Sequence, residues 1–303
     1  MNEAAVTATG ADPGGEGGLV RVRLDLDYDG TRFVGWAAQP GRRTVAGVLV
    51  AGLGVVLRTD PDQLGLVVAG RTDSGVHATG QVCHIDCTWQ SWSALPGRSD
   101  LDPPAAMVRR LAGILPSDVR VRSARIVPAG FDARFSALRR RYAYRISDHP
   151  AGPPPLRRHD VFWCRRPLDV AAMDSAAGRM VGLRDFAAFC RRREGASTVR
   201  TLLEYSWHRD VDDLVVARVV ADAFCHSMVR ALVGGALAVG EGRCDEDWPA
   251  RVLAGRVRHP GVNVAPPQGL VLEEVCYPPD DELGLRAQQA RAMRSADSAP
   301  LAQ

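Results

Sequence analysis

The 303-residue sequence contains no lysine, no cysteine pair spaced C-x-x-C and no hydrophobic run long enough to cross a membrane. Its longest nearly apolar stretch, Val45 to Leu57, covers 13 residues, whereas a transmembrane helix needs roughly 20. The seven cysteines, an odd number without a C-x-x-C pair, argue against a disulfide framework and against a zinc ribbon. The sequence therefore gives no reason to expect a membrane protein or a small disulfide-rich one.

Because lysine is absent, all 38 basic residues are arginine, and they exceed the 35 acidic residues by only three. A net charge of +3 does not by itself identify a nucleic-acid-binding protein. GC-rich codon usage is the simpler cause of the exclusive use of arginine. Each arginine nevertheless carries a planar guanidinium group, which suits binding to phosphate and stacking on bases. Hydrophobic residues at 46% predict a sizeable core, and the length favours two domains or one large one.

One cluster of potential metal ligands comprises Cys83, His84, Asp86 and Cys87. Side chains alternate between the two faces of a strand, so the two cysteines would lie on one face and His84 and Asp86 on the other. Four groups divided in this way cannot converge on a single ion. We therefore expect no metal site in the chain.

Hydrophobic periodicity predicts the same order of elements in the two halves of the chain. In the first half, period-two alternation predicts a strand over 19–27, and Thr44 is placed to cap the next helix. The further elements expected there are helices over 45–57 and 105–114 and strands over 64–69, 81–87 and 119–127. The second half is expected to contain strands over 139–146, 201–207, 214–220 and 270–277 and helices over 170–181, 227–239 and 248–254.

Each half thus reads strand, helix, strand, strand, helix, strand, the order of the ferredoxin-like fold and of many RNA-binding domains. We expect an α+β protein with two such halves, each an antiparallel sheet with helices on one face. The expected domains are 19–130 and 131–279, and the break between them lies near residues 128–138.

The two ends of the chain differ from this pattern. Segment 1–18 is Gly-rich and lacks the basic segment and apolar core of a secretory signal. We expect it to be a disordered tail, and we expect the protein to be cytoplasmic. Segment 280–303 is polar and Ala-rich, and is expected to be a tail that is either a frayed helix or disordered.

The most informative motif is the segment Gly70 to Ala78, which follows an apolar strand. Two glycines bracket the carboxylate of Asp73 and the guanidinium of Arg71, and His77 follows. Loops on rigid strands carry function disproportionately, so Asp73 is a candidate catalytic residue. The alternative is a plain turn in which Asp73 only bonds nearby backbone N–H groups.

Two arginine clusters contain or flank aromatic residues, one over 139–145 and one over 186–193. Cations that follow phosphates beside aromatics that stack on bases are typical of proteins that bind RNA loops. The alternative is a strand with one buried aromatic face and one solvated charged face. A third segment, 224–230, opens a helix with Arg230 in its first turn, where a cation opposes the helix dipole. We therefore expect a carboxylate to pair with Arg230.

These residues together resemble the tRNA pseudouridine synthase A family. The matching segments extend from residue 20 to residue 277, nearly all of the chain expected to be ordered. They are Tyr28-Asp29-Gly30, Gly35-Trp36, Thr44-Val45, the loop 70–78 with Gly80-Gln81, Phe131, 133–137, Arg141-Tyr142, Tyr144, Asp185-Phe186, Phe189, Met228-Val229-Arg230, Ala265-Pro266 and Gly269-Leu270. The loop around Asp73 is the most specific of them.

The resemblance implies an isomerase without cofactor or metal that detaches uracil from its ribose and rejoins it through C5. Members of the family act at positions 38, 39 and 40 in the anticodon stem-loop of tRNA, and they generally work as homodimers. The resemblance also implies the pseudouridine synthase fold, in which the two sheets flank a central active-site cleft. No membrane partner is implied.

By matching position, Asp73 would be the catalytic carboxylate, and it would attack C1′ of the sugar, add to the base or abstract a proton at C2′. Arg230 would pair with Asp73 and keep it ionised. Tyr142 would pack against the target base and assist proton loss from C5, and Arg71 would help to extrude the nucleotide or occupy its vacated space. His77 would order the loop.

The sequence departs from the family pattern outside this loop. Ala37 and Ala46 stand where glutamine is usual, and Cys225 stands where an aliphatic residue is common. A noncatalytic RNA-binding protein is the alternative from another class, although such a protein has no need of a carboxylate in an RNA-facing cleft. Dinucleotide binding is not supported, because no G-x-G-x-x-G follows a strand.

Overall fold

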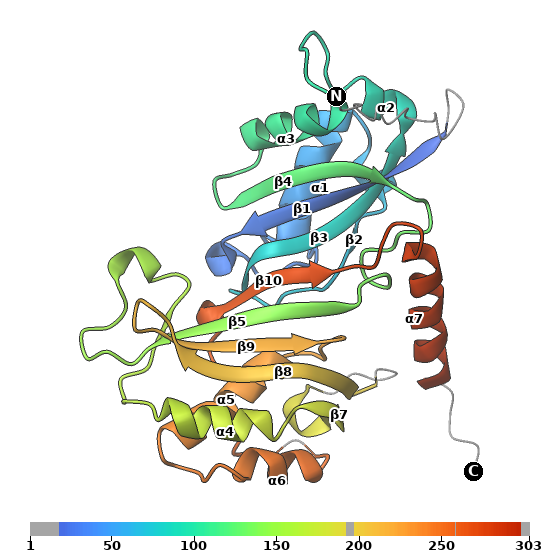
Figure 1. Cartoon of the computed structure of the whole chain (residues 1–303). Helices are drawn as coiled ribbons and strands as arrows, with labels where there is room; N and C mark the ends of the chain where they lie inside the picture. The colour runs from blue at the N-terminus through green and yellow to red at the C-terminus, as the bar shows by residue number, and fades with distance from the viewer. Residues whose placement is uncertain (1–17, 192–196, 258, 298–303) are drawn as a thin grey trace, which may run out of the picture.

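The computed structural model describes residues 18–191, 197–257 and 259–297, and it has a mixed α+β architecture (Figure 1). Most of the expected tail 1–18 and the last six residues of 280–303 lie outside this range. The first half contains β1 (Leu19–Tyr28), α1 (Val45–Leu57), β2 (Val67–Val68), β3 (His77–Thr88), α2 (Trp89–Ser93), α3 (Pro103–Ile114) and β4 (Val119–Val127). The second half contains β5 (Arg139–Ser147), β6 (Phe162–Trp163), α4 (Val170–Gly178), β7 (Gly182–Asp185), β8 (Val199–Arg209), β9 (Val215–Ala221), α5 (Met228–Gly240), α6 (Trp248–Ala254), β10 (Leu270–Cys276) and α7 (Leu283–Asp297).

The strands form one continuous sheet in the order β4-β1-β3-β10-β5-β9-β8-β7, with β2 paired to β3 and β6 paired to β5. The strand orders β4-β1-β3-β2 and β10-β5-β9-β8 are the same in the two halves. Most neighbours are antiparallel, but Val271 and Leu272 of β10 pair in parallel with His77 and Ala78 of β3. The expectation of two separate sheets is therefore wrong, because β10 hydrogen-bonds to a strand of each half and joins them (Figure 1).

Helices α1 and α5 lie behind the sheet in the view of Figure 1. Helix α1 begins where the sequence predicted, since Thr44 Oγ1 accepts the Gly47 N–H at 3.2 Å. In α5 every residue except Arg230 is buried, which is typical of a helix packed on all sides. Each leucine or valine buried there contributes about 1.5–3 kcal/mol.

The expected elements agree with the structure best where periodicity is strong, and differ near the loop of Asp73. β3 begins at His77 rather than at residue 81, because its first residues pair with β10. The strand expected over 64–69 is reduced to β2, since Pro61–Leu64 forms a 3-10 turn. In the segment 280–303, α7 forms a helix that packs on the protein, since Leu283 and Ala287 are buried and Ser136 Oγ donates to the Leu283 carbonyl at 2.9 Å, so the expected frayed or disordered tail is not what the described residues form. No helix among the described residues is long and apolar enough to cross a bilayer.

Candidate active site

The loop between β2 and β3 carries Asp73 and is held mainly through its backbone. The Trp36 N–H donates to the Thr72 carbonyl at 3.1 Å, and the Gly75 N–H donates to the Phe33 carbonyl at 3.2 Å. The Val76 N–H donates to the carbonyl of Asp73 at 3.2 Å. Because these bonds use backbone groups, they fix the loop and leave the Asp73 side chain to make other contacts.

The Asp73 carboxylate contacts the second half of the chain. Ser227 Oγ lies 3.1 Å and Arg230 Nη1 3.5 Å from Asp73 Oδ2, and His226 Nε2 lies 3.4 Å from Asp73 Oδ1. The expected pair between Asp73 and Arg230 is therefore present. Among the described residues, no backbone N–H bonds this carboxylate, so the plain-turn alternative does not describe the loop.

Ser227 has an unusual backbone conformation directly before α5. Its φ of +62° lies in the left-handed region, which non-glycine residues adopt at a cost. Serine before a helix usually caps it, but here the side chain makes no capping bond and its hydroxyl lies against Asp73. Ser227 and His226 were not expected at the site, although both lie in the segment 224–230 that contains Arg230.

Arg230 is fixed by the segment that precedes β10. Its Nε donates to the Ala265 carbonyl at 2.7 Å, and the Ala265 N–H donates back to the Arg230 carbonyl at 2.9 Å. The close approach depends on Gly234, where a Cβ would lie 1.7 Å from the Asn263 carbonyl oxygen. The guanidinium is thus held between a backbone carbonyl and Asp73.

Tyr142 projects from β5 into a buried environment, with 8% of its surface exposed. Its ring meets Phe224 edge to face, with the ring centroids 5.1 Å apart. Burial raises the pKa of the Tyr142 phenol to about 12, and the nearby charge of Arg140 opposes this shift while that of Asp73 adds to it. The hydroxyl is therefore neutral at physiological pH.

The remaining predicted residues of the loop have contrasting environments. Arg71 is exposed to solvent and lies two residues before Asp73 in the chain. His77 is buried, burial lowers the pKa of its imidazole, and its Nδ1 accepts the Gly30 N–H at 3.1 Å. This bond fastens the end of the loop, as expected of a residue that orders it.

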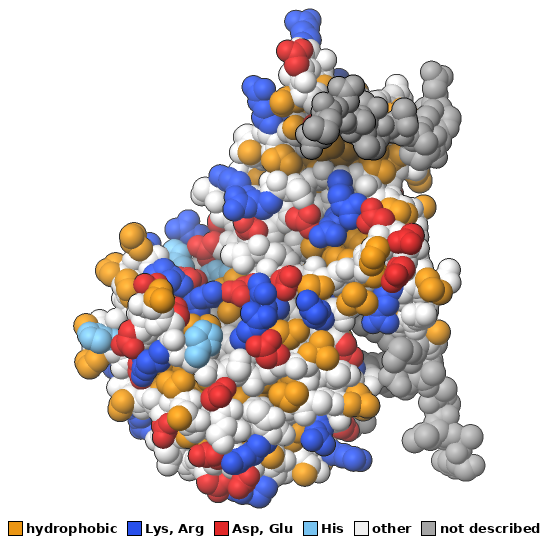
Figure 2. Space-filling model, viewed as in Figure 1, with side chains coloured by type: hydrophobic (Ala, Val, Ile, Leu, Met, Phe, Trp, Pro, Cys, Tyr) orange, Lys and Arg blue, Asp and Glu red, His pale blue; other side chains and the backbone are white. Residues whose placement is uncertain are grey.

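The arginine cluster on β5 is less available to RNA than the sequence suggested. Arg140 is 6% exposed and lies inside the protein, so its expected role as a phosphate contact is wrong. Arg141 pairs with Glu273 and Glu274. Figure 2 shows acidic and basic side chains interspersed over the face turned to the viewer. In the second cluster, Arg192 and Arg193 lie outside the described residues.

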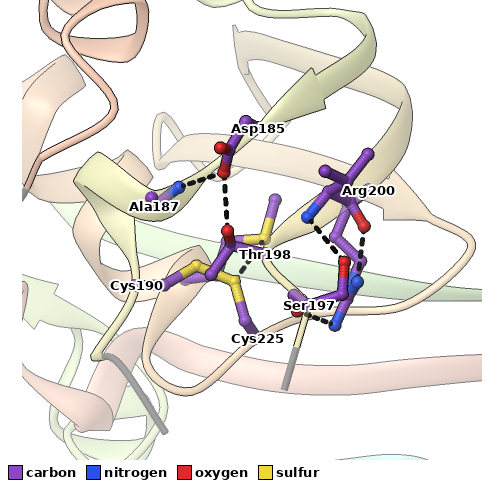
Figure 3. Close-up of a disulfide and its surroundings, with 9 residues drawn as sticks. Asp185, Ala187, Cys190, Ser197, Thr198, Arg200 and Cys225 are labelled. Atoms are coloured by element: carbon purple, nitrogen blue, oxygen red, sulfur yellow. Dashed lines mark hydrogen bonds between the residues drawn. A yellow bond between two sulfur atoms is a disulfide. The ribbon is translucent and has the colours of Figure 1, made fainter. Parts of the chain in front are cut away.

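A disulfide joins Cys190 to Cys225, the residue directly before His226 (Figure 3). The cysteine pattern had argued against a disulfide framework, and this single bond was not expected. The two residues are 35 positions apart, and only the fold brings their Cα atoms to 5.8 Å. Beside the bond, Asp185 Oδ1 accepts the Ala187 N–H and the Thr198 hydroxyl.

The residues weighed as metal ligands have other partners. Cys83 and Cys87 are buried in the core. Asp86 binds Arg21 in a bidentate ion pair, with both N–O distances 2.7 Å. His84 Nδ1 accepts the Ala133 N–H at 3.0 Å. Within the described ranges no cluster of three potential ligands occurs.

Comparison with known proteins agrees with the resemblance drawn from the motifs. A family model described as tRNA pseudouridine synthase matches residues 176–278. A protein named tRNA pseudouridine synthase A from Frankia casuarinae is 58% identical over 277 residues, which cover 91% of this chain and 96% of that protein. Proteins of the same name from Streptomyces griseus and Mycobacterium leprae are 54% and 48% identical, over 92% and 91% of this chain and 96% of each relative. With this level of identity over nearly the full length of both partners, the chain belongs to the tRNA pseudouridine synthase A family.

Proposed function

We propose that this protein converts uridine to pseudouridine at positions 38, 39 and 40 in the anticodon stem-loop of tRNA, with Asp73 as the catalytic carboxylate. One observation carries the assignment of the site. A carboxylate from one half of the chain contacts Arg230, Ser227 and His226 from the other half. Family membership provides the substrate class.

The reaction is an isomerisation whose atoms balance without a co-reactant. The N1–C1′ bond breaks, a C5–C1′ bond forms, the proton at C5 leaves and N1 gains a proton. No electrons are exchanged, so the protein has to supply only a carboxylate, a path for one proton and a pocket for a nucleotide flipped out of its stack.

Each site residue has a part in this scheme. Asp73 acts as an ionised carboxylate, by attack on C1′, by addition to the base or by abstraction of a C2′ proton. Arg230 and Ser227 hold Asp73 in place. Tyr142 packs against the base and assists proton loss from C5. Arg71, which is exposed two residues before Asp73, helps to extrude the nucleotide or fills the space that it leaves.

The proposed function also includes a division of the chain into two halves, a tRNA partner and a homodimeric state. Residues 19–130 and 131–279 act as two ferredoxin-like halves with the active-site cleft between them, and the equal strand orders of the two halves support this division. The Gly-rich segment 1–18 is assigned to neither half, whereas α7, within 280–303, packs against Asp132 and Ser136 of the second half. The partner is tRNA, the enzyme works as a homodimer in the cytoplasm, and it needs neither cofactor nor metal.

The test is tritium release from tRNA labelled at uracil C5, with purified protein and no added cofactor or metal. Wild-type protein is expected to release tritium, and the Asp73→Asn variant is expected to release none while it still binds tRNA. Absence of release by the wild type from several tRNAs, with binding retained, would instead favour a noncatalytic RNA-binding protein.

A further inference from the structure

Arg140 is a buried cation that the scheme above does not use. Among the described residues, no carboxylate lies within ion-pair distance of its guanidinium. Instead, Nη1 donates to the Asp222 carbonyl at 2.7 Å, and Nη2 donates to the Ala69 carbonyl at 2.9 Å and to the Arg134 carbonyl at 2.8 Å. Burying a charge without a counterion costs free energy, which these three carbonyl dipoles offset in part.

Two of the three carbonyls, those of Ala69 and Asp222, belong to segments that lead to the site. Ala69 directly precedes the loop that carries Asp73. Asp222 follows β9 and begins the connection that leads to Ser227. One planar guanidinium therefore links the segment that precedes Asp73 to the segment that precedes its partners on α5.

The Asp222 side chain strengthens this connection. Its Oδ1 accepts the N–H groups of Thr201 and Ala223, at 3.1 Å and 2.6 Å. Both sides of Asp222 are thereby fixed, with its carbonyl bound to Arg140 and its carboxylate bound to the backbone. A displacement of Arg140 would be transmitted to the chain leading to α5.

Arg140 also acts on Tyr142, two residues further along β5. The positive charge of Arg140 opposes the rise that burial causes in the Tyr142 pKa. Burial in turn lowers the pKa of Arg140 itself. The cation is thus electrostatically coupled to Tyr142, besides being bonded to the segment that precedes Asp73 and to the segment that precedes Ser227.

We propose that Arg140 is a positioning residue of the active site, which holds the Asp73 loop and the start of α5 in register through the backbone carbonyls of Ala69 and Asp222. This inference rests on the function proposed for Asp73. A displacement of about 1 Å in a reacting group can cost 10²-fold in rate. Loss of Arg140 is therefore expected to reduce the rate of the chemical step and to leave the affinity for tRNA unchanged.

The experiment compares Arg140→Met, Arg140→Lys and a matched control, Arg21→Met. Arg21 also bridges backbone carbonyls, those of Ala129 and Phe131, but these are remote in the chain from the Asp73 loop. Measurements are the single-turnover rate of tritium release at saturating enzyme, the tRNA Kd and thermal unfolding. Rates are expressed per folded molecule at a temperature at which each variant is folded.

Arg140→Met is expected to slow the single-turnover step about 100-fold, with Kd within about twofold of wild type, whereas Arg21→Met lowers Tm without slowing this step. Arg140→Lys keeps the charge but not the planar fork, so an intermediate loss of about tenfold is expected. Equal rates for Arg140→Met and Arg21→Met would overturn the inference. If Arg140→Met does not fold, Arg140→Lys decides, because a wild-type rate in that variant is equally incompatible with the proposal.

The same assay separates this inference from the proposed function. Failure of the wild type to release tritium, or release by Asp73→Asn at the wild-type rate, would remove the proposed function itself. Release that is lost in Asp73→Asn but unaffected in both Arg140 variants would leave the function intact and remove the role of Arg140 alone.

Discussion

The loop of Asp73 and the segment around Ser227 contribute to one site in different ways. The first is fixed by backbone hydrogen bonds to the residues that follow β1, and it presents a single side chain. The second meets Asp73 with three side chains, two from consecutive residues before α5 and one from its first turn, and the residue directly before the helix has a left-handed backbone conformation. In the function proposed above, the first region would supply the reactive group and the second region would orient it.

The sharpest test of this comparison is Asp73→Asn. The amide keeps the size of the side chain but removes its charge, so we expect pseudouridine formation to fall at least about 10⁴-fold, as for other essential catalytic groups. Asp73 is partly exposed, and the free energy of unfolding should change by less than about 1 kcal/mol. Asp118→Asn, which loses a remote ion pair with Arg43, is the control and should remain active. Comparable activity in both variants would contradict the assignment.

Tyr142→Phe tests the Tyr142 hydroxyl, which belongs to neither the loop of Asp73 nor the segment around Ser227. The ring and its contact with Phe224 remain, while the hydroxyl is lost, and the rate should fall about 10²-fold to 10⁴-fold if this group moves the C5 proton. Tyr205→Phe is the matched control, because Tyr205 is also buried but projects from β8. Single-turnover tritium release measures both. A normal rate in Tyr142→Phe would restrict Tyr142 to packing.

Gly234→Ala disturbs the packing of residues 263–265 against α5, which holds Arg230 in place. The new Cβ would collide with the Asn263 carbonyl, so we expect a loss of about 2–3 kcal/mol in the free energy of unfolding and lower activity through displacement of Arg230. Gly178→Ala places the same methyl group at a helical glycine with nothing within 4 Å, and it should stabilise the protein by up to about 1 kcal/mol. Denaturant unfolding followed by activity assays measures both, and equal stability of the two variants would contradict the steric argument.

The smallest effects are expected at Ser227. Ser227→Gly and Ser227→Ala both remove the hydroxyl near Asp73, and both should lower the rate about tenfold. They should differ in stability, because glycine tolerates the left-handed backbone and alanine does not. Ser227→Gly should therefore be more stable than Ser227→Ala by about 1 kcal/mol in thermal or denaturant unfolding. The opposite order would exclude backbone strain at this position.

The two regions also differ in how far the sequence reveals them. Asp73 could be singled out because it lies in a glycine-bracketed loop after an apolar strand, but the local sequence also fits a plain turn, and only the family resemblance implied that Asp73 is the catalytic carboxylate. The contact between Asp73 and Arg230 could be expected from the family resemblance, and the structure confirms it. The contact with Ser227 could not be expected, because serine before a helix ordinarily indicates a cap.

The same limit applies to the fold. The strands over 119–127 and the helices over 45–57 and 248–254 coincide with the predicted ranges, since local periodicity and caps determine them. The early start of β3 and the joining of the two halves depend on pairing with β10, far along the chain. The burial of Arg140 likewise follows from tertiary packing, because a run of three arginines reads locally as a solvated surface.

The position of β10 has a consequence for biosynthesis. During translation, the nascent chain exposes the free edges of β3 and β5 until residues 270–276 emerge from the ribosome, because only this strand pairs with both. Unpaired strand edges promote aggregation of incomplete chains. The segment that fixes Arg230 through Ala265 also emerges late, so the contacts of the proposed site are completed only when almost the whole polypeptide has been made.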